Sequence, residues 1–308
     1  MISEQIIQIL KKMYMVACCF GFIGNLTAMF MFSRKKYKNT IFSSYFRILT
    51  LIDVLVLLTR IDYFLKDNGK IALRMVSTFF CKSTMYIIYL TPSISSWIMV
   101  LISLDRFVSI VMPAKFLFRK QIKYQLLACT VAIVYNTLFS IPVIITYEYY
   151  LKKTSSNTTW PKCSHPSYSI DIIDIINSSM IPFVLMLILT LLILRTIFKS
   201  RSKTTQTINK KDIRFAITSI SLNISFLILK LPHSFFTFLE FFLTEIDEST
   251  DAFIYTLLSI FMYSHHGSLF YLTFITNTAF RKEFISLFRN DIPSLIDSHF
   301  SSLNQSNN

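Results

Sequence analysis

Charged residues and glycine are scarce in this chain, and each scarcity argues against a class of protein. Asp, Glu, Lys and Arg make up 16% of the 308 residues, whereas a soluble domain carries roughly a quarter. Only four glycines are present and internal repeats are absent, which argues against a transporter or channel with broken, Gly-rich helices. Five histidines are too few for a membrane di-iron enzyme, and the chain has no Gly-x-Ser-x-Gly motif. We therefore expect neither a transporter nor an enzyme.

Long apolar runs dominate the sequence instead. Hydrophobic residues make up 53% of the chain, with thirty phenylalanines. Seven apolar stretches are each about 20 residues or longer, enough to span a bilayer. They cover residues 13–33, 44–65, 78–111, 124–146, 170–197, 212–243 and 251–275. Because a lipid-facing backbone must satisfy its own hydrogen bonds, each stretch should be a helix. We predict an all-α membrane protein, a seven-transmembrane helix bundle without a separate soluble domain.

Basic residues set the expected orientation of this bundle, because cytoplasmic loops are enriched in Lys and Arg. The turns after spans one, three and five are basic: Arg34, Lys35, Lys36 and Lys38; Lys115, Arg119, Lys120 and Lys123; Arg195, Lys199, Arg201, Lys203, Lys210, Lys211 and Arg214. The loop between spans six and seven is acidic, with Glu240, Glu245, Asp247, Glu248 and Asp251. We therefore expect an extracellular N-terminus and a cytoplasmic C-terminus in a multi-pass plasma-membrane protein. The net charge of +14 reflects this topology rather than nucleic-acid binding.

Two of the five cysteines map to the outer face. Cys81 opens span three, and Cys163 lies in the loop between spans four and five. That compartment is oxidising, so we expect a disulfide that holds the loop over the mouth of the bundle; two free thiols are the alternative. Asn157, in "NTTW" on the same loop, is an expected glycosylation site. Asn177, in "NSSM" near the outer end of span five, is an ambiguous one.

Several motifs occur in an order and at separations typical of one receptor family. Gly24–Asn25, "LIDVL" at 51–55, Cys81 and "LDRF" at 104–107 follow one another, with 28 residues from Asn25 to Asp53 and 25 from Cys81 to Arg106. Over residues 13–289 the chain resembles the rhodopsin-like (class A) G-protein-coupled receptors, as a divergent, peptide-receptor-like member. The resemblance implies helix kinks at Pro182 and Pro232.

The resemblance also implies a division of the chain. Residues 1–12 would be a short extracellular N-terminus, 13–275 the receptor domain, 276–289 an amphipathic helix on the membrane surface and 290–308 a disordered cytoplasmic tail. The apolar stripe of the 276–289 helix is suited to lying at the lipid interface; its members are Phe280, Phe284, Leu287 and Phe288.

The pair Asp105–Arg106 interrupts an apolar run at the inner end of span three. A guanidinium there is costly in lipid unless it pairs or reaches water, and Asp105 can neutralise it. By resemblance, Asp212 at the start of span six completes an inactive latch, which opens when a ligand shifts the population of states. A heterotrimeric G protein would then bind the opened cleft. The alternative is that Arg106 snorkels as an orientation anchor.

Asp53 is a second charge inside a span, where an ionisable side chain is functional by default. The resemblance places it in a polar network with Asn25 and Ser95 that binds an allosteric sodium ion; no other cofactor is expected. The alternative is a protonated Asp53 that shares hydrogen bonds with Asn25. The family's span-seven Asn-Pro-x-x-Tyr is replaced by "LFYLT", which puts Leu269 opposite Asp53 and removes the proline.

The residues at the expected ligand-pocket positions argue against two classes of ligand. Ile88 stands where amine receptors carry an aspartate, and Tyr263 where opsins carry the retinal lysine, so neither ligand is favoured. Further pocket candidates are Tyr86, Tyr89, Lys230 and His233. The acidic outer loop and the aromatic upper spans favour a basic peptide, although an ordinary solvated loop explains the same residues.

Lys230 replaces the family's span-six tryptophan. Because Lys230 is positively charged, an alternative function is that of a chemosensory receptor for a small acidic molecule. A receptor-like binding protein that does not signal is a third hypothesis, because spans six and seven are altered. The adjacent His265 and His266 are interpreted as polar packing residues, since neighbours on a helix point about 100° apart.

Overall fold

The computed structural model describes residues 4–38, 43–67, 72–111, 122–153, 159–165, 169–202, 210–242 and 247–287. Its elements are α1 (Glu4–Ser33), α2 (Lys35–Lys38), α3 (Ser43–Asp67), η1 (Leu73–Met75), α4 (Thr78–Val111), α5 (Ile122–Phe139), α6 (Ile141–Thr146), β1 (Glu148–Lys153), β2 (Thr159–Ser164), α7 (Ser169–Ile175), η3 (Ile176–Met180), α8 (Ile181–Ser202), α9 (Lys210–Ser225), η4 (Phe226–Lys230), α10 (Leu231–Glu240), α11 (Glu248–Gly267) and α12 (Leu269–Thr276). Residues 278–287 are also helical. Asn157 and the tail 290–308 lie outside the described residues.

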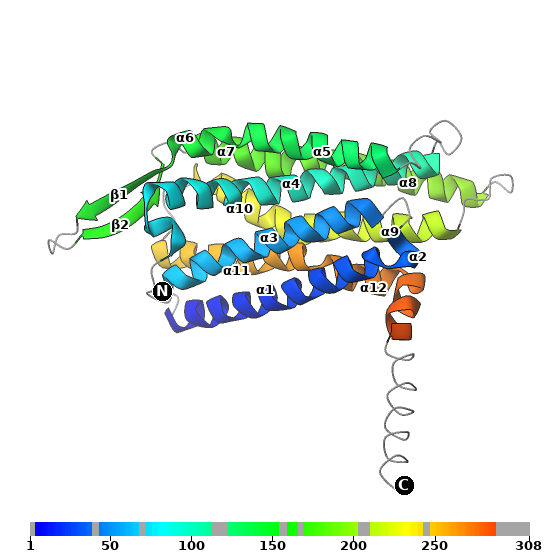
Figure 1. Cartoon of the computed structure of the whole chain (residues 1–308), viewed down its shortest axis with the longest axis horizontal. Coiled ribbons are helices and arrows are strands. Elements are labelled where there is room, and N and C mark those ends of the chain that lie inside the picture. The colour runs from blue at the N-terminus through cyan, green and yellow to red at the C-terminus, as the bar shows by residue number, and fades with distance from the viewer. Residues whose placement is uncertain are drawn as a thin grey trace, which may run out of the picture.

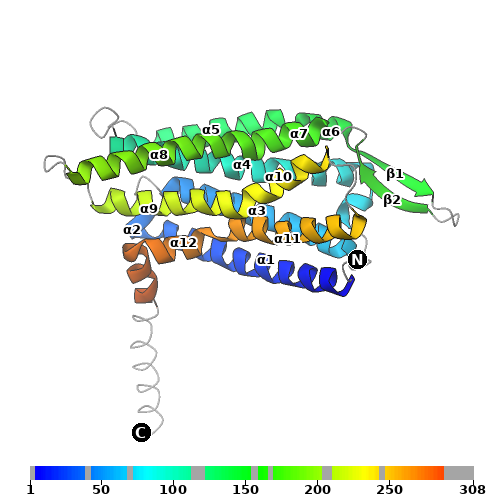
Figure 2. The ribbon, with the colours of Figure 1, turned by 180° about the vertical axis from the view of Figure 1, so that it is seen from behind.

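The helices lie side by side along one axis (Figure 1). Among the described residues they form seven rods: α1, α3, α4, α5–α6, α7–α8, α9–α10 and α11–α12. Figure 2 shows the same bundle from behind, with β1 and β2 projecting from one end. We call this the hairpin end, and the opposite end, with α2 and residues 278–287, the α2 end. The N-terminal end of α1 lies at the hairpin end.

The rods match the predicted spans closely, except at the start of the first. There α1 begins at Glu4 instead of residue 13, because good helix formers such as Gln8 and Lys11 continue the helix beyond the apolar run. Five described helical segments are long and apolar enough to cross a membrane: Gln5–Ser33, Thr78–Val111, Ile122–Thr146, Ser169–Lys199 and Ile213–Glu240. The other two rods are α3, which carries Arg47, Asp53 and Arg60, and α11–α12, which is interrupted at Ser268.

Both predicted kink prolines follow a widened turn. The π-helical turn η3 precedes Pro182, and the π-helical turn η4 precedes Pro232. Proline has no backbone N–H, and its ring crowds the carbonyl four residues earlier, which favours a widened turn before it. Not every proline produces one, since α4 stays α-helical through Pro92. The seventh rod breaks at Ser268 without a proline, and the Ser268 hydroxyl bonds the carbonyl oxygen of His265 at 2.7 Å.

The prediction of a purely helical protein was incomplete, because the loop between the fourth and fifth rods contains a β-hairpin. Strands β1 and β2 pair antiparallel from Glu148↔Ser164 to Lys153↔Thr159. Both strands carry residues with high strand propensity, such as Tyr149, Tyr150 and Trp160. In the hairpin Cys163 pairs with Tyr149. Its bond to Cys81 holds this part of β2 close to the start of α4.

At the α2 end the helix 278–287 folds against the bundle. Its N-terminus is capped by the Oδ1 atom of Asn277, which accepts hydrogen bonds from the backbone N–H groups of Ala279 and Phe280 at 3.1 and 3.2 Å. Phe280 is fully buried and its ring lies 5.3 Å from that of Phe32. Of the predicted apolar stripe, Phe280 is buried in the protein core, and Phe284 and Leu287 are partly buried against it. Phe288 lies outside the described residues. The position of this helix on the membrane surface stays a prediction.

Candidate functional site

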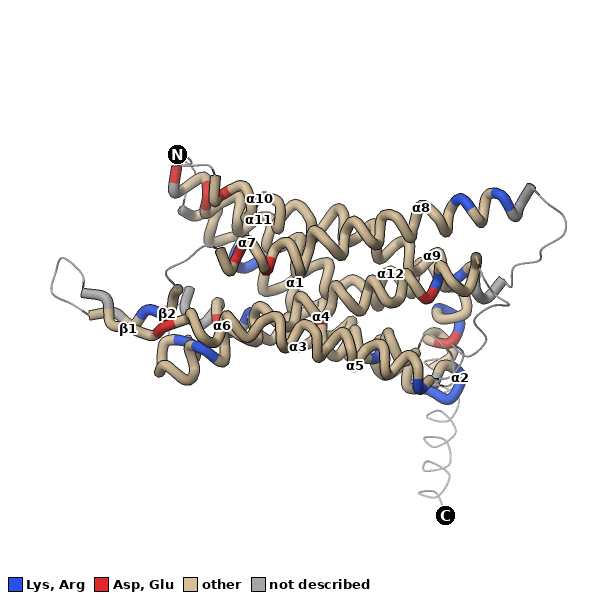
Figure 3. The backbone as a smooth tube through the Cα atoms, turned by 90° about the horizontal axis from the view of Figure 1, so that it is seen from above, with Lys and Arg blue, Asp and Glu red and all other residues tan. Residues whose placement is uncertain are grey.

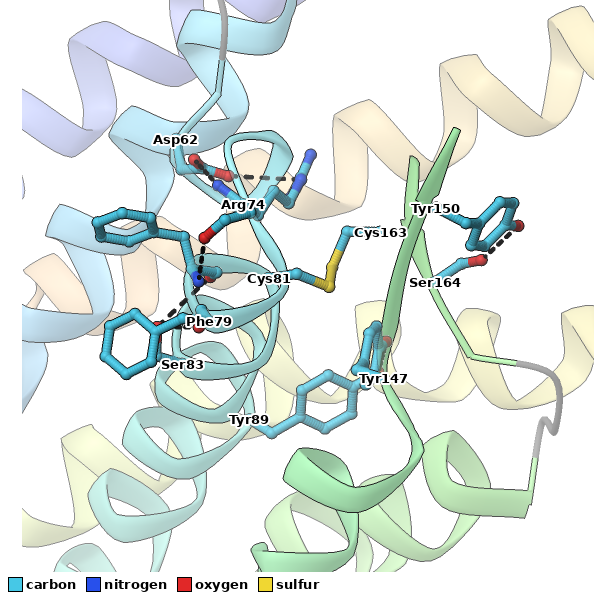
Figure 4. Close-up of a disulfide and its surroundings, with 12 residues drawn as sticks. Asp62, Arg74, Phe79, Cys81, Ser83, Tyr89, Tyr147, Tyr150, Cys163 and Ser164 are labelled. Carbon is cyan, nitrogen blue, oxygen red and sulfur yellow. Dashed lines mark hydrogen bonds and ion pairs between the residues drawn. A yellow bond between two sulfur atoms is a disulfide. The ribbon is translucent and has the colours of Figure 1, made fainter. Parts of the chain in front are cut away.

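A disulfide joins the hairpin to the top of α4. Cys81 and Cys163 are bonded, as predicted, across 82 residues of chain. Figure 4 shows this bond beside a second tie, between Asp62 of α3 and Arg74 of η1. The Nε of Arg74 lies 3.4 Å from the Oδ2 of Asp62, and both side chains are almost fully buried. The hairpin and η1 are thus fixed to α3 and α4.

Beneath these ties lies a cavity of about 360 Å³. Five of the six predicted pocket residues line it: Ile88, Tyr89, Lys230, His233 and Tyr263. The sixth, Tyr86, is a wrong prediction. Its hydroxyl instead donates to the carbonyl oxygen of Thr137 on α5, at 3.0 Å, because Tyr86 lies on a different face of α4.

Lys230 forms part of the cavity wall at the junction of η4 and α10. Its ammonium donates to the Ser96 hydroxyl at 2.5 Å and to the Pro92 carbonyl oxygen at 3.2 Å. Both acceptors are neutral, and the side chain is 1% exposed. No ion pair joins Lys230 to an acid among the residues that the structure describes. The cavity therefore carries a buried cation that only neutral protein groups contact.

Acidic side chains line the cavity from α7. Asp171 accepts a hydrogen bond from the Tyr89 hydroxyl and lies 3.0 Å from the Nε2 of His165. Asp174 accepts one from Ser178 at 3.4 Å. Both acids, and Arg60 from α3, line the cavity but were not singled out from the sequence. The available signal was an ionisable residue inside or at the edge of an apolar span.

Asp53 forms a polar contact between three rods in the middle of the bundle. Its Oδ1 lies 2.7 Å from the Ser95 hydroxyl and 2.7 Å from the Nδ1 of His266. Asn25 does not contact Asp53; its side-chain amide donates to the carbonyl oxygen of His266 at 2.9 Å. His266 thus supplies the polar contact from span seven that Leu269 cannot make.

The sodium ion expected at these residues stays a prediction. Hard cations take carboxylate, carbonyl, hydroxyl and water oxygens as ligands. Here the Nδ1 of His266 bonds one oxygen of Asp53, the side-chain amide nitrogen of Asn25 donates to the backbone of α11, and the Asn25 Oδ1 is buried without a hydrogen-bond partner. Of the predicted network, Asp53 and Ser95 are in contact, and His266 joins them in a hydrogen-bonded cluster.

The neighbouring His265 serves a different contact. Its Nδ1 lies 3.0 Å from the hydroxyl of Ser225 on α9, so the two histidines face different rods. Both are buried, in agreement with their interpretation as polar packing residues. Within the described residues there is no group of three or more His, Cys, Asp or Glu side chains that could hold a metal ion.

Arg106 lies inside the bundle at the α2 end. It is 1% exposed and bonds Asp105, the preceding residue. The snorkelling alternative requires contact with water or lipid headgroups, which this burial does not provide. Asp212 lies in the first turn of α9, but its side chain is outside the described ones. Its contact with Arg106 therefore stays a prediction.

A glycine contact brings the first and seventh rods together. A Cβ built on Gly267 would lie 2.5 Å from the Cα of Gly21, so the two backbones touch where only glycine fits. Close approach through small residues is a common way for membrane helices to pack. It brings His266 within reach of Asn25 on α1.

Comparison with known proteins identifies the family. The model described as 7 transmembrane receptor (rhodopsin family) matches residues 24–267. The chain is similar to the N-arachidonyl glycine receptors of Homo sapiens and Macaca fascicularis, each 27% identical over 239 residues, and of Bos taurus, 26% identical over 238. Each alignment covers 72% of this chain and 68% of the relative.

The matched proteins are receptors and not enzymes, as predicted for this chain. Its apolar helices are those of a multi-pass membrane protein. The matched region runs from Gly24 in α1, through the disulfide and the cavity, to Gly267 at the end of α11. The chain belongs to the rhodopsin family of seven-transmembrane receptors.

Proposed function

We propose that this receptor binds an extracellular ligand in the cavity at the hairpin end and activates a heterotrimeric G protein at the α2 end. One observation carries the proposal. The helix α4 lines the cavity through Ile88 and Tyr89 and, farther along, holds the buried Arg106. A change in the cavity can therefore be transmitted to the opposite end along one helix whose middle contacts Asp53 through Ser95.

The proposed orientation puts the hairpin end outside the cell. Basic residues gather on α2 and at the end of α8 (Figure 3), which suits a cytoplasmic face. A disulfide at the other end suits an oxidising compartment. In this proposal α3 and α11–α12 also cross the plasma membrane, with an extracellular N-terminus and a cytoplasmic C-terminus, and Asn157 is glycosylated.

Two ligand classes have support. An acidic small molecule is favoured by Lys230, whose buried ammonium faces only neutral protein acceptors. The similar receptors are named for N-arachidonyl glycine, an apolar acyl chain that ends in a carboxylate. A basic peptide, the class favoured by the sequence, finds support in Glu240 and Asp174 on the cavity wall. Asp171 supports it less, since His165 and Tyr89 already contact its carboxylate.

The test is a signalling assay with a control that separates signalling from binding. Cells would express the receptor with a panel of chimeric G proteins and be exposed to acidic lipids, other small acids and peptides. We expect a response from the wild type and none from Arg106→Ala at equal surface expression. Bound ligand without a response through any G protein would instead identify the third hypothesis, a binding protein that does not signal.

A further inference from the structure

Arg60 is a buried cation in the wall of the cavity. It lies in the outer half of α3, is 9% exposed and lines the cavity opposite the acids of α7. Its Nε atom is buried without a hydrogen-bond partner. No hydrogen bond or ion pair of its guanidinium is found among the residues that the structure describes. A guanidinium stays charged in proteins and has five N–H donors, so this group lacks the acceptors that burial normally demands.

Aromatic rings are the contacts that Arg60 does make. Its Cζ lies 4.1 Å from the ring centroid of Tyr263 and 4.5 Å from that of Tyr63. Ring faces attract a cation and hold it in place, but they offer no acceptor in the plane of the N–H donors. Tyr63 and Tyr263 therefore position the guanidinium and leave its hydrogen-bonding edge without an acceptor.

Arg74 provides a comparison within the same molecule. It is also buried, at 4% exposure, and its Cζ lies 3.9 Å from the ring centroid of the same Tyr63. Unlike Arg60, it has a carboxylate partner: Asp62 contacts its Nε at 3.4 Å and its backbone N–H at 3.3 Å. Both arginines thus contact the ring of Tyr63, but only Arg74 also has a carboxylate partner.

The other charges of the cavity do not neutralise Arg60. Asp171 is hydrogen-bonded to Tyr89 and lies against His165, and Asp174 is hydrogen-bonded to Ser178, all of them residues outside α3. Glu240, the third acid on the cavity wall, forms no ion pair with Arg60 among the described residues. Lys230 adds a second cation to the same cavity. Two buried cations therefore border the space that a ligand would enter, and no acid of the described chain forms an ion pair with either.

We propose that Arg60 binds the carboxylate of the receptor's ligand. The planar fork of a guanidinium matches two carboxylate oxygens, and a carboxylate is the group that supplies the missing in-plane acceptors. The inference rests on the proposed function, because it assigns a chemical class to the ligand of the same cavity. A volume of about 360 Å³ is at the small end of ligand pockets and suits an acidic headgroup or a small acid.

The experiment compares acids with their uncharged esters. Purified full-length receptor in lipid nanodiscs would be titrated with N-acylglycines of short, medium and long acyl chain, N-arachidonyl glycine included, each beside its methyl ester, and binding followed by the thermal unfolding midpoint. We expect at least one acid to bind roughly tenfold or more tightly than its ester, which is the loss of one charge-assisted pair. Preference for short chains would identify a small acid, and preference for long chains a lipid.

Variants then assign the effect to Arg60. Arg60→Met should remove the preference for acid over ester, and Arg60→Lys should retain part of it, because an ammonium keeps the charge without the fork. The matched control is the double variant Asp62→Asn with Arg74→Met, which removes the neighbouring arginine together with its partner and should keep the preference.

The stability of the ligand-free receptor provides a second readout. Arg60→Met should leave the midpoint unchanged or raise it, since it removes an unpaired buried charge, whereas Arg74→Met alone should lower it by stranding Asp62. The inference fails if no acid binds better than its ester, if the preference survives Arg60→Met, or if Arg60→Met destabilises the receptor as much as Arg74→Met does. All of these measurements use the purified receptor without a G protein. A failure of the proposed signalling would therefore appear only in the signalling assay, separately from a failure of this inference.

Discussion

The contact between Asp53 and His266 should couple α3 to α11 more strongly than an ordinary hydrogen bond between membrane helices. The Nδ1–Oδ1 distance is 2.7 Å, and the two side chains are 3% and 1% exposed. Hydrogen bonds between membrane helices average about 0.6 kcal/mol in double-mutant cycles, whereas those to charged groups contribute roughly 1.5–3 kcal/mol. Because a carboxyl and an imidazole form this pair away from water, we expect a coupling of about 2 kcal/mol.

The assay is a double-mutant cycle with Asp53→Ala, His266→Ala and the combined variant. Unfolding of the receptor would be followed in mixed micelles as the fraction of denaturing detergent rises. Ser225 and His265 offer a matched control, because a hydroxyl and an imidazole lie 3.0 Å apart there, also between two rods. The same cycle on that pair should give about 0.6 kcal/mol, the average for membrane helices.

A defined result would refute this reasoning. Residues without a shared interaction add within about 0.5 kcal/mol. If Asp53 and His266 were additive to that degree, or coupled no more strongly than Ser225 and His265, the histidine could not be regarded as the partner that replaces the family's span-seven residue.

Three further predictions follow from the same structure. Replacing NaCl by KCl at constant ionic strength should shift the unfolding midpoint by less than about 1 °C, because an ion stabilises only by binding and His266 already bonds an oxygen of Asp53. A midpoint several degrees higher in sodium would instead show that the cluster around Asp53 binds the ion. Gly267→Ala should cost about 1–3 kcal/mol by overpacking, since its Cβ would meet backbone at 2.5 Å. In the control Gly24→Ala the new Cβ meets the side-chain ring of Tyr271 instead, so this variant should lose less stability. Equal unfolding midpoints for the two variants would argue against the backbone contact at Gly267. Cys81→Ser should lower the free energy of unfolding by about 4.5 kcal/mol, the loop entropy for a separation of 82 residues, and reductant should lower the wild-type midpoint to that of the variant.

The rods were predictable because the bilayer imposes one rule on every span. A run of apolar residues long enough to cross must be helical, so α4 begins and ends at the predicted residues, 78 and 111. The disulfide was predictable because the predicted topology left two cysteines on the side expected to be oxidising. The hairpin was not, since β1 and β2 lie outside the apolar spans, where the bilayer rule gives no guidance, and are separated in sequence by residues 154–158.

The position of the site could be predicted from the sequence, but the hydrogen-bond partners of its buried charged residues could not. Lys230, His233 and Tyr263 were placed in the pocket from sequence, and they line the cavity. Which acceptor a buried charge finds depends on how the rods are rotated, and the sequence of one rod does not contain that information. His266 therefore could not be assigned to Asp53, and Arg60 resembled any other charge near a span end until its surroundings were known.

The fold at the α2 end limits which parts of the receptor can move there. Glu283 lies 3.4 Å from the Nε of Arg34 and 2.6 Å from the Nζ of Lys36, while Phe280 fills the space between the same turn and α12. These contacts connect the first rod, its turn and the end of the seventh rod. In the proposed orientation, we expect the cytoplasmic end to open on the remaining side, where α8 and α9 pack against the last turns of α4. A probe attached to residues 278–287 should then move less than a probe on α9.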